Sequence, residues 1–204
     1  MDNVLITKIE NYISKLYNEN NPPENVYHNL FHTQKVVQIT KEICNYIKID
    51  SENREVLTIA AWFHDLGHIF TWEGHEDISI KFAKKFLINN NYNSTKIEKI
   101  CNCIYVTKLD VKPNNYLEQI ICDADLSYLG SDDFFKRSNL LRKEMEVRKK
   151  ILFSDIQWLK LNKEFIEGQE FYTDYGKKKL DKIKKINLDK INSQLLKLQN
   201  MEKL

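Results

Sequence analysis

The scarcity of helix-breaking residues is the feature that most constrains the fold of this chain. Its 204 residues include only 5 Gly and 3 Pro. Because these two residue types mark most turns, a chain with so few of them favours long helices over a turn-rich β fold. Apolar residues recur at helical spacing through most of the sequence, and no segment is convincing as a strand. The sequence therefore predicts an all-α fold, a single-domain helical bundle.

Helical periodicity also predicts where the helices lie. The expected ranges are 3–19, 27–47, 51–67, 76–87, 94–107, 117–129, 132–149, 154–168 and 177–202. Ser51 and Ser94 are expected to cap the helices that they begin. No internal repeat, linker or boundary is visible, so we expect one domain over residues 1–204. Its core is expected at about residues 25–130, with the helices of about 131–204 packed on it.

Charge and cysteine content exclude several classes of protein. The chain has 31 basic and 29 acidic residues, a net charge of +2 that indicates neither nucleic acid nor a membrane surface as partner. Its first residues do not form a secretory signal, and no apolar run approaches the roughly 18 residues that span a membrane. The cysteines form no C-x-x-C pair, which predicts reduced, buried thiols in a cytoplasmic protein. They are Cys44, Cys101, Cys103 and Cys122.

Histidine is confined to one part of the chain. All five histidines lie between residues 28 and 75. His64 and Asp65 place a nitrogen donor beside an oxygen donor at the end of an apolar helix, where both can bind one cation. With His32 upstream and Asp125 downstream, three segments supply two nitrogens and two carboxylates. This set suits Mn, Fe, Co, Ni, Zn or Mg, with positions left for water or substrate.

The motifs around these residues resemble those of a known family. The strongest are Tyr27-His-Asn-Leu-Phe-His-Thr33, Ala61-Trp-Phe-His-Asp65 and Asp123-Ala-Asp-Leu-Ser-Tyr-Leu-Gly130. In order and spacing they resemble the HD-domain metal-dependent phosphohydrolases, most closely a branch of small bacterial predicted phosphohydrolases. Weaker similarities are Glu76 with Ser79, Thr107-Lys108, Leu141-Arg-Lys-Glu144, Phe171-Tyr-Thr173 and Asn187-Leu188. The resemblance covers roughly residues 25 to 198 and implies an HD-type fold with a metal held by His32, His64, Asp65 and Asp125.

Three positions depart from that branch and shape the expected chemistry. Leu109 stands where the branch often has His, His68 where it often has Tyr, and His75 where it often has Asn. The missing imidazole at position 109 weakens a full two-metal site. We therefore expect one metal, with His68 and His75 as phosphate-binding or acid–base groups.

The remaining candidates each have a functional and a structural interpretation. Glu76 and Lys108 complete the expected catalytic set; the alternatives are a carboxylate at a helix start and a solvated lysine. His28 either holds the loop before its helix or touches substrate. Asp123 either orients a ligand, caps a helix or binds the metal directly. Two further residues, Thr107 and Arg142, are candidates for holding a metal ligand in place or for contact with substrate. The alternative for Arg142 is a surface ion pair.

These residues predict a metal-dependent phosphohydrolase. Its substrate would be a small phosphate ester or a nucleotide-like phosphomonoester or diester, attacked by a metal-bound water. Two alternatives stay open: an HD-type di-iron oxygenase, with His68 and His75 as extra ligands, and a non-catalytic metal- or nucleotide-binding regulatory module. The expected partner is a small phosphorylated molecule, with nucleotides included, and neither nucleic acid nor a membrane is expected.

Overall fold

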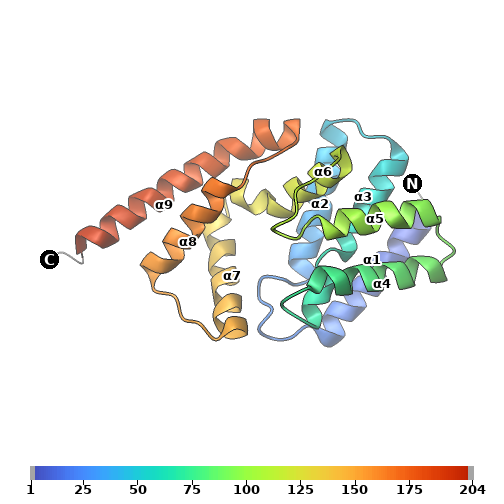
Figure 1. The fold of residues 1–204 in the computed structure, drawn as a ribbon, viewed down its shortest axis with the longest axis horizontal. Helices are drawn as coiled ribbons and strands as arrows, with labels where there is room; N and C mark the ends of the chain where they lie inside the picture. The colour runs from blue at the N-terminus through green and yellow to red at the C-terminus, as the bar shows by residue number, and fades with distance from the viewer. Residues whose placement is uncertain (1–2, 202–204) are drawn as a thin grey trace. The chain divides into compact units, whose positions relative to one another are not determined.

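The computed structural model describes residues 3–201 and confirms the all-α fold. Nine α-helices and three shorter helical turns account for most of this range, and no strand occurs within it (Figure 1). The chain forms two compact units, which divide after Asp125. One domain over residues 1–204 stays a prediction.

The first unit is organised around α3 (Ser51–Phe63). Every side chain from Val56 to Phe63 is buried, as expected for a helix that is apolar on all sides. The surrounding helices are α1 (Asn3–Asn20), α2 (Leu30–Tyr46), α4 (His75–Asn89), α5 (Ser94–Tyr105) and α6 (Tyr116–Asp125). Because α3 is enclosed, the residues that follow its last turn are held inside the unit.

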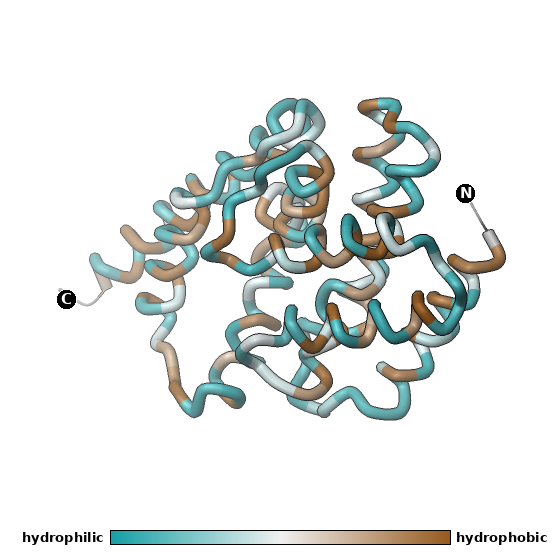
Figure 2. Tube along the Cα trace, turned by 45° about the vertical axis from the view of Figure 1, so that its right-hand side comes forward, coloured by the Kyte–Doolittle hydropathy of each residue, from teal (hydrophilic) through white to brown (hydrophobic). Residues whose placement is uncertain are grey.

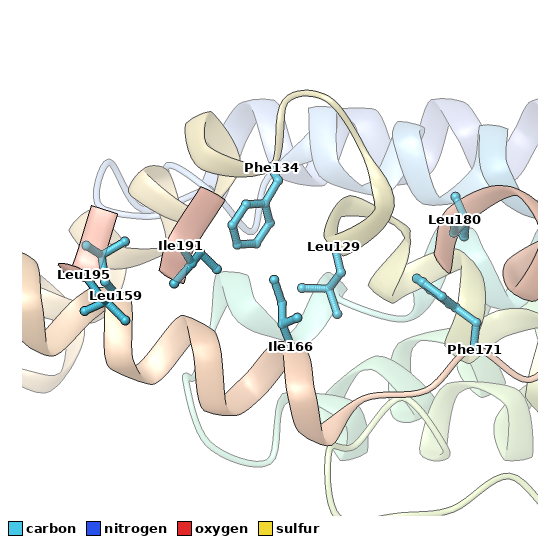
Figure 3. Packing of buried hydrophobic residues seen from close by; sticks show 8 residues of the cluster. All are labelled: Leu129, Phe134, Leu159, Ile166, Phe171, Leu180, Ile191 and Leu195. Atoms are coloured by element: carbon cyan, nitrogen blue, oxygen red, sulfur yellow. The ribbon is translucent and has the colours of Figure 1, made fainter. Parts of the chain in front are cut away.

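The second unit has a core of its own. It consists of η2 (Leu126–Gly130), α7 (Phe134–Lys149), α8 (Asp155–Gly168), the π-helix η3 (Gly176–Leu180) and α9 (Asp181–Met201). Figure 3 shows the apolar side chains that form this core, which are Leu129, Phe134, Leu159, Ile166, Phe171, Leu180, Ile191 and Leu195. The Asn187 amide of α9 donates hydrogen bonds to the carbonyl oxygens of Leu129 and Ser131 at 3.0 and 2.9 Å. These bonds fix α9 to the segment around η2.

Two of the predicted helix caps are wrong by one residue. Asp50 caps α3 by accepting a backbone hydrogen bond of 2.9 Å from three residues on, so Ser51 is the first helical residue instead. Asn93 caps α5 in the same way at 3.0 Å, in place of Ser94. Asp and Asn cap as well as Ser does, so the earlier residue of each pair caps the helix and the serine becomes its first residue.

Other helix ends also differ from the predictions. α2 begins at Leu30, because Asn29 caps it, so Tyr27 and His28 lie in the preceding loop. α3 ends at Phe63 instead of Gly67, and the 3-10 helix η1 (Leu66–Ile69) follows shortly after it. The helix expected at 117–129 is α6 followed by η2. The last predicted helix is η3 followed by α9, and its expected end at residue 202 lies outside the described residues.

Apolar and polar stretches alternate along the helices of both units (Figure 2). This pattern is typical of helices that bury one side in a protein core. Within residues 3–201, none of the helices combines the length and the apolar character that a bilayer-spanning segment needs.

Candidate metal centre

His64 and Asp65 lie where α3 ends. The His64 ring places Nδ1 2.8 Å from the carbonyl oxygen of Ala61. Because a carbonyl oxygen only accepts, this contact assigns the donated proton to Nδ1 and directs Nε2 away from the helix backbone. Asp65 leaves the helical conformation at φ −106° and ψ 5°, a backbone region in which many active-site residues occur.

The other two members of the group come from α2 and α6. His32 lies in the first turn of α2, and the Asn29 side chain accepts a hydrogen bond of 3.2 Å from the His32 backbone N–H. The cap therefore fixes the turn that carries this imidazole. Asp125 is the last residue of α6. We refer to His32, His64, Asp65 and Asp125 as the His/Asp cluster.

The donor atoms of the His/Asp cluster converge on one point. Nε2 of His32 lies 3.0 Å from Oδ2 of Asp65 and 3.4 Å from Oδ1 of Asp125. Nε2 of His64 lies 3.2 and 3.4 Å from the same two oxygens. Donors bound to one cation by bonds of about 2.1 Å lie roughly 3.0–3.4 Å apart. The spacing and the donor types therefore fit a single divalent metal ion.

Charge on these side chains supports the same interpretation. Burial by itself lowers the pKa of His64, but the Asp65 and Asp125 carboxylates outweigh it and raise that pKa well above its usual range. Burial raises the pKa of Asp125, yet hydrogen bonds from His32 and His64 lower it to about 2. Two ionised carboxylates held in the interior require a positive charge between them. A divalent cation held by the cluster would supply that charge in place of a protonated His64.

A second group of side chains shares Asp65. Nε2 of His75, the first residue of α4, lies 3.5 Å from Oδ1 of Asp65, the oxygen that does not face His32. The His68 ring stacks on the His75 ring with the ring centroids 3.6 Å apart. The His28 ring in turn stacks on the His68 ring, with centroids 3.9 Å apart. Asp65, His68 and His75 also offer donor atoms within 4.8 Å of one another. The structure thus brings together the histidines that the sequence assigned to the site.

Glu76 lies beside this second group. Its Oε1 is 3.6 Å from Nε2 of His75, and its side chain is buried. Burial lowers the pKa of His75, but Asp65 and Glu76 outweigh it and raise that pKa. The Trp72 carbonyl oxygen lies 3.1 Å from Nδ1 of His75, so Nδ1 donates and Nε2 faces the two carboxylates.

The other predicted site residues take different positions. Asp123 is buried in α6 but does not belong to the His/Asp cluster among the described residues. Lys108 lies in the turn after α5, and no ion pair within residues 3–201 joins it to that cluster. The Thr107 hydroxyl donates to the carbonyl oxygen of Ile104 at 2.8 Å. The catalytic or substrate-binding roles of these three residues stay predictions.

Arg142 is engaged within the second unit. Its Nη1 donates to Asp155 at 2.7 Å and its Nε to Glu146 at 2.9 Å, and Nη2 donates to the Phe153 carbonyl oxygen. These contacts join α7 to the start of α8. They give Arg142 a structural role, while its contact with substrate stays a prediction.

Two supporting residues were not expected in their observed roles. Asn25 is buried and donates a hydrogen bond of 2.9 Å to the carbonyl oxygen of His68. Ser79 accepts a hydrogen bond of 2.9 Å from the backbone N–H of Gly67. The similarity of Glu76 and Ser79 to the family's motif singled out Ser79 but did not predict this hydrogen bond. Nothing in the sequence singled out Asn25.

A largely buried His/Asp cluster able to hold a divalent cation, at the end of a central helix in an all-α unit, defines the class of site. A family model described as HD domain matches residues 29–127, a range that includes every member of the cluster. Residues 29–127 therefore match the HD-domain superfamily, whose members are typically metal-dependent hydrolases. No curated protein and no solved structure gives a significant match to the chain.

Proposed function

We propose that this chain is a metal-dependent phosphohydrolase that acts on a small phosphate ester. The observation that carries the proposal is the convergence of His32, His64, Asp65 and Asp125 at separations of 3.0 to 3.4 Å. A divalent cation bound there would lower the pKa of a water molecule and offset the negative charge of a phosphoryl oxygen.

Each residue of the site would have its own role in the reaction. The four members of the His/Asp cluster hold the cation, and the Ala61 carbonyl keeps the His64 ring in the required tautomer. His75, about a fifth exposed, is the acid–base group that we place beside the reacting phosphate. Asp65 and Glu76 orient its Nε2 atom. Hydrolysis forms one bond from the water oxygen to phosphorus, breaks the bond to the leaving oxygen and transfers a proton to that oxygen.

The proposal is tested by metal content and phosphate release. Purified protein, loaded in turn with Mn, Fe, Co, Ni, Zn or Mg, is assayed on a panel of phosphomonoesters, phosphodiesters and nucleotides. We expect phosphate release that requires the metal and is lost in Asp65→Ala. Asp77→Asn, an exposed carboxylate on α4, serves as the matched control. Bound metal without turnover on the whole panel would contradict the proposal and favour a regulatory module.

A second candidate, a di-iron oxygenase, is favoured by one observation. Asp65 belongs both to the His/Asp cluster and to the group with His68 and His75, so six residues surround two adjacent positions. Two irons per chain together with oxygen consumption would support this reaction. One metal per chain and no oxygen consumption would support the phosphohydrolase.

A further inference from the structure

Gly67 and Ser79 connect the two segments that carry His68 and His75. The backbone N–H of Gly67 in η1 donates a buried hydrogen bond of 2.9 Å to Oγ of Ser79 on α4. Ser79 is fully buried. A buried N–H without an acceptor is costly, so this bond holds η1 against α4.

Gly67 also lies directly against the backbone of His75. A Cβ atom at position 67 would lie 2.0 Å from the carbonyl oxygen of His75 and 2.7 Å from its carbonyl carbon. Only glycine allows this approach. The first turn of α4 therefore packs on η1 without an intervening side chain. The hydrogen bond from Gly67 to Ser79 joins the same two elements.

The residues on both sides of Gly67 contact the His75 ring. Oδ1 of Asp65, two positions before it, is 3.5 Å from Nε2 of His75. The His68 ring, one position after it, stacks on the His75 ring at 3.6 Å. A movement of α4 relative to η1 would change both contacts at once.

We infer that Ser79 is a positioning residue, which sets the place of the His75 imidazole beside Asp65 by anchoring the backbone of Gly67. This inference rests on the proposed function, in which His75 acts at the phosphate. The competing explanation is that the Ser79 bond only stabilises the fold, while the Trp72 carbonyl places His75.

Kinetics of Ser79→Ala give the first test, with a phosphate ester that the wild-type protein hydrolyses. Displacing an acid–base group lowers turnover more than it weakens substrate binding. We therefore expect kcat to fall about tenfold while KM stays within about twofold of the wild-type value. The control is Thr40→Val, which removes a buried hydroxyl that donates within its own helix to Val36. This control should leave kcat unchanged, and a Ser79→Ala enzyme with unchanged kcat would overturn the inference.

A double-mutant cycle separates positioning from general destabilisation. If Ser79 acts through His75, adding Ser79→Ala to His75→Gln should lower kcat by less than about twofold. Equal losses in the wild-type and His75→Gln backgrounds would overturn the inference. Ser79→Cys, which has a similar size and a weaker acceptor, replaces Ser79→Ala in every comparison if the alanine variant does not fold.

Histidine-ring NMR tests the placement without turnover. In ¹⁵N–¹H spectra of the metal-free protein, the His75 signals are assigned by their loss in His75→Gln. We expect Ser79→Ala to shift these signals while the His64 signals keep their positions, because the His64 ring is held within its own segment by Ala61. Unchanged His75 signals would overturn the inference. An absence of phosphatase activity in the wild-type protein would instead contradict only the proposed function.

Discussion

Nε2 of His32 lies 3.4 Å from Oδ1 of Asp125, the last residue of α6. Asp123, two residues earlier on the same helix, is buried but contributes no oxygen to the cluster among the described residues. The two carboxylates are therefore expected to differ in their effect on metal binding.

Asp125→Asn is expected to lower the affinity for the metal by more than about a hundredfold, because it removes a charged ligand. Asp123→Asn is expected to lower the affinity for the metal by about tenfold or less, as for a residue that supports the ligands without binding the metal. Equilibrium dialysis with metal analysis measures both. A larger loss in Asp123→Asn than in Asp125→Asn would reverse the ligand assignment.

Gly67→Ala is expected to destabilise the protein by about 3 kcal/mol, because the new Cβ atom would overlap the His75 carbonyl. Gly168→Ala is the matched control, since a Cβ atom there has nothing within 4 Å. Its effect should lie within about 0.5 kcal/mol. Urea unfolding followed by circular dichroism gives both values, and similar stabilities of the two variants would argue against the tight contact.

Arg142→Ala is expected to destabilise the protein by about 1–3 kcal/mol, because Glu146, Asp155 and the Phe153 carbonyl lose their donors. Lys163→Ala, which removes an exposed pair with Glu167, should change stability by about 0.5 kcal/mol or less. Thermal melts compare the two. Metal content should be unchanged in Arg142→Ala, since none of its described contacts involves a ligand.

The thiols of the folded protein are expected to react slowly in mildly alkaline solution. Burial raises the pKa of Cys44 to about 11 and that of Cys103 to about 12. At pH 8.5 the thiolate fraction of Cys103 is then about three orders of magnitude below that of a thiol with its usual pKa. Mass spectrometry after iodoacetamide treatment checks this against urea-unfolded protein, in which all four cysteines should react quickly.

The same pKa shifts predict how stability changes with pH. Between about pH 9 and 11 the Cys44 thiol ionises in the unfolded chain but stays protonated in the fold, so the free energy of unfolding should fall. Cys44→Ala should make that fall less steep. Equal slopes for the two proteins would contradict the raised pKa of Cys44.

Much of the fold was predictable because it depends on local patterns. Helical spacing and few breakers gave the order of the helices, whereas their ends depend on which polar residue caps first, as at Asp50 and Asn93. Of the site, the cluster residues were predictable from motif order. The stacking of His28, His68 and His75 was not, because it depends on the close approach of Gly67 to the His75 backbone, which no spacing in the sequence encodes.

The central claim is that the His/Asp cluster holds a divalent cation, and metal content of His64→Ala tests it most directly. Thr40→Val, which changes a buried polar residue of the same unit outside the cluster, is the control. After loading and dialysis, we predict at least one tightly bound metal ion per chain in the wild-type and Thr40→Val proteins and less than about a tenth of that in His64→Ala, with helical content preserved. Retention of stoichiometric metal by a folded His64→Ala protein would contradict the account.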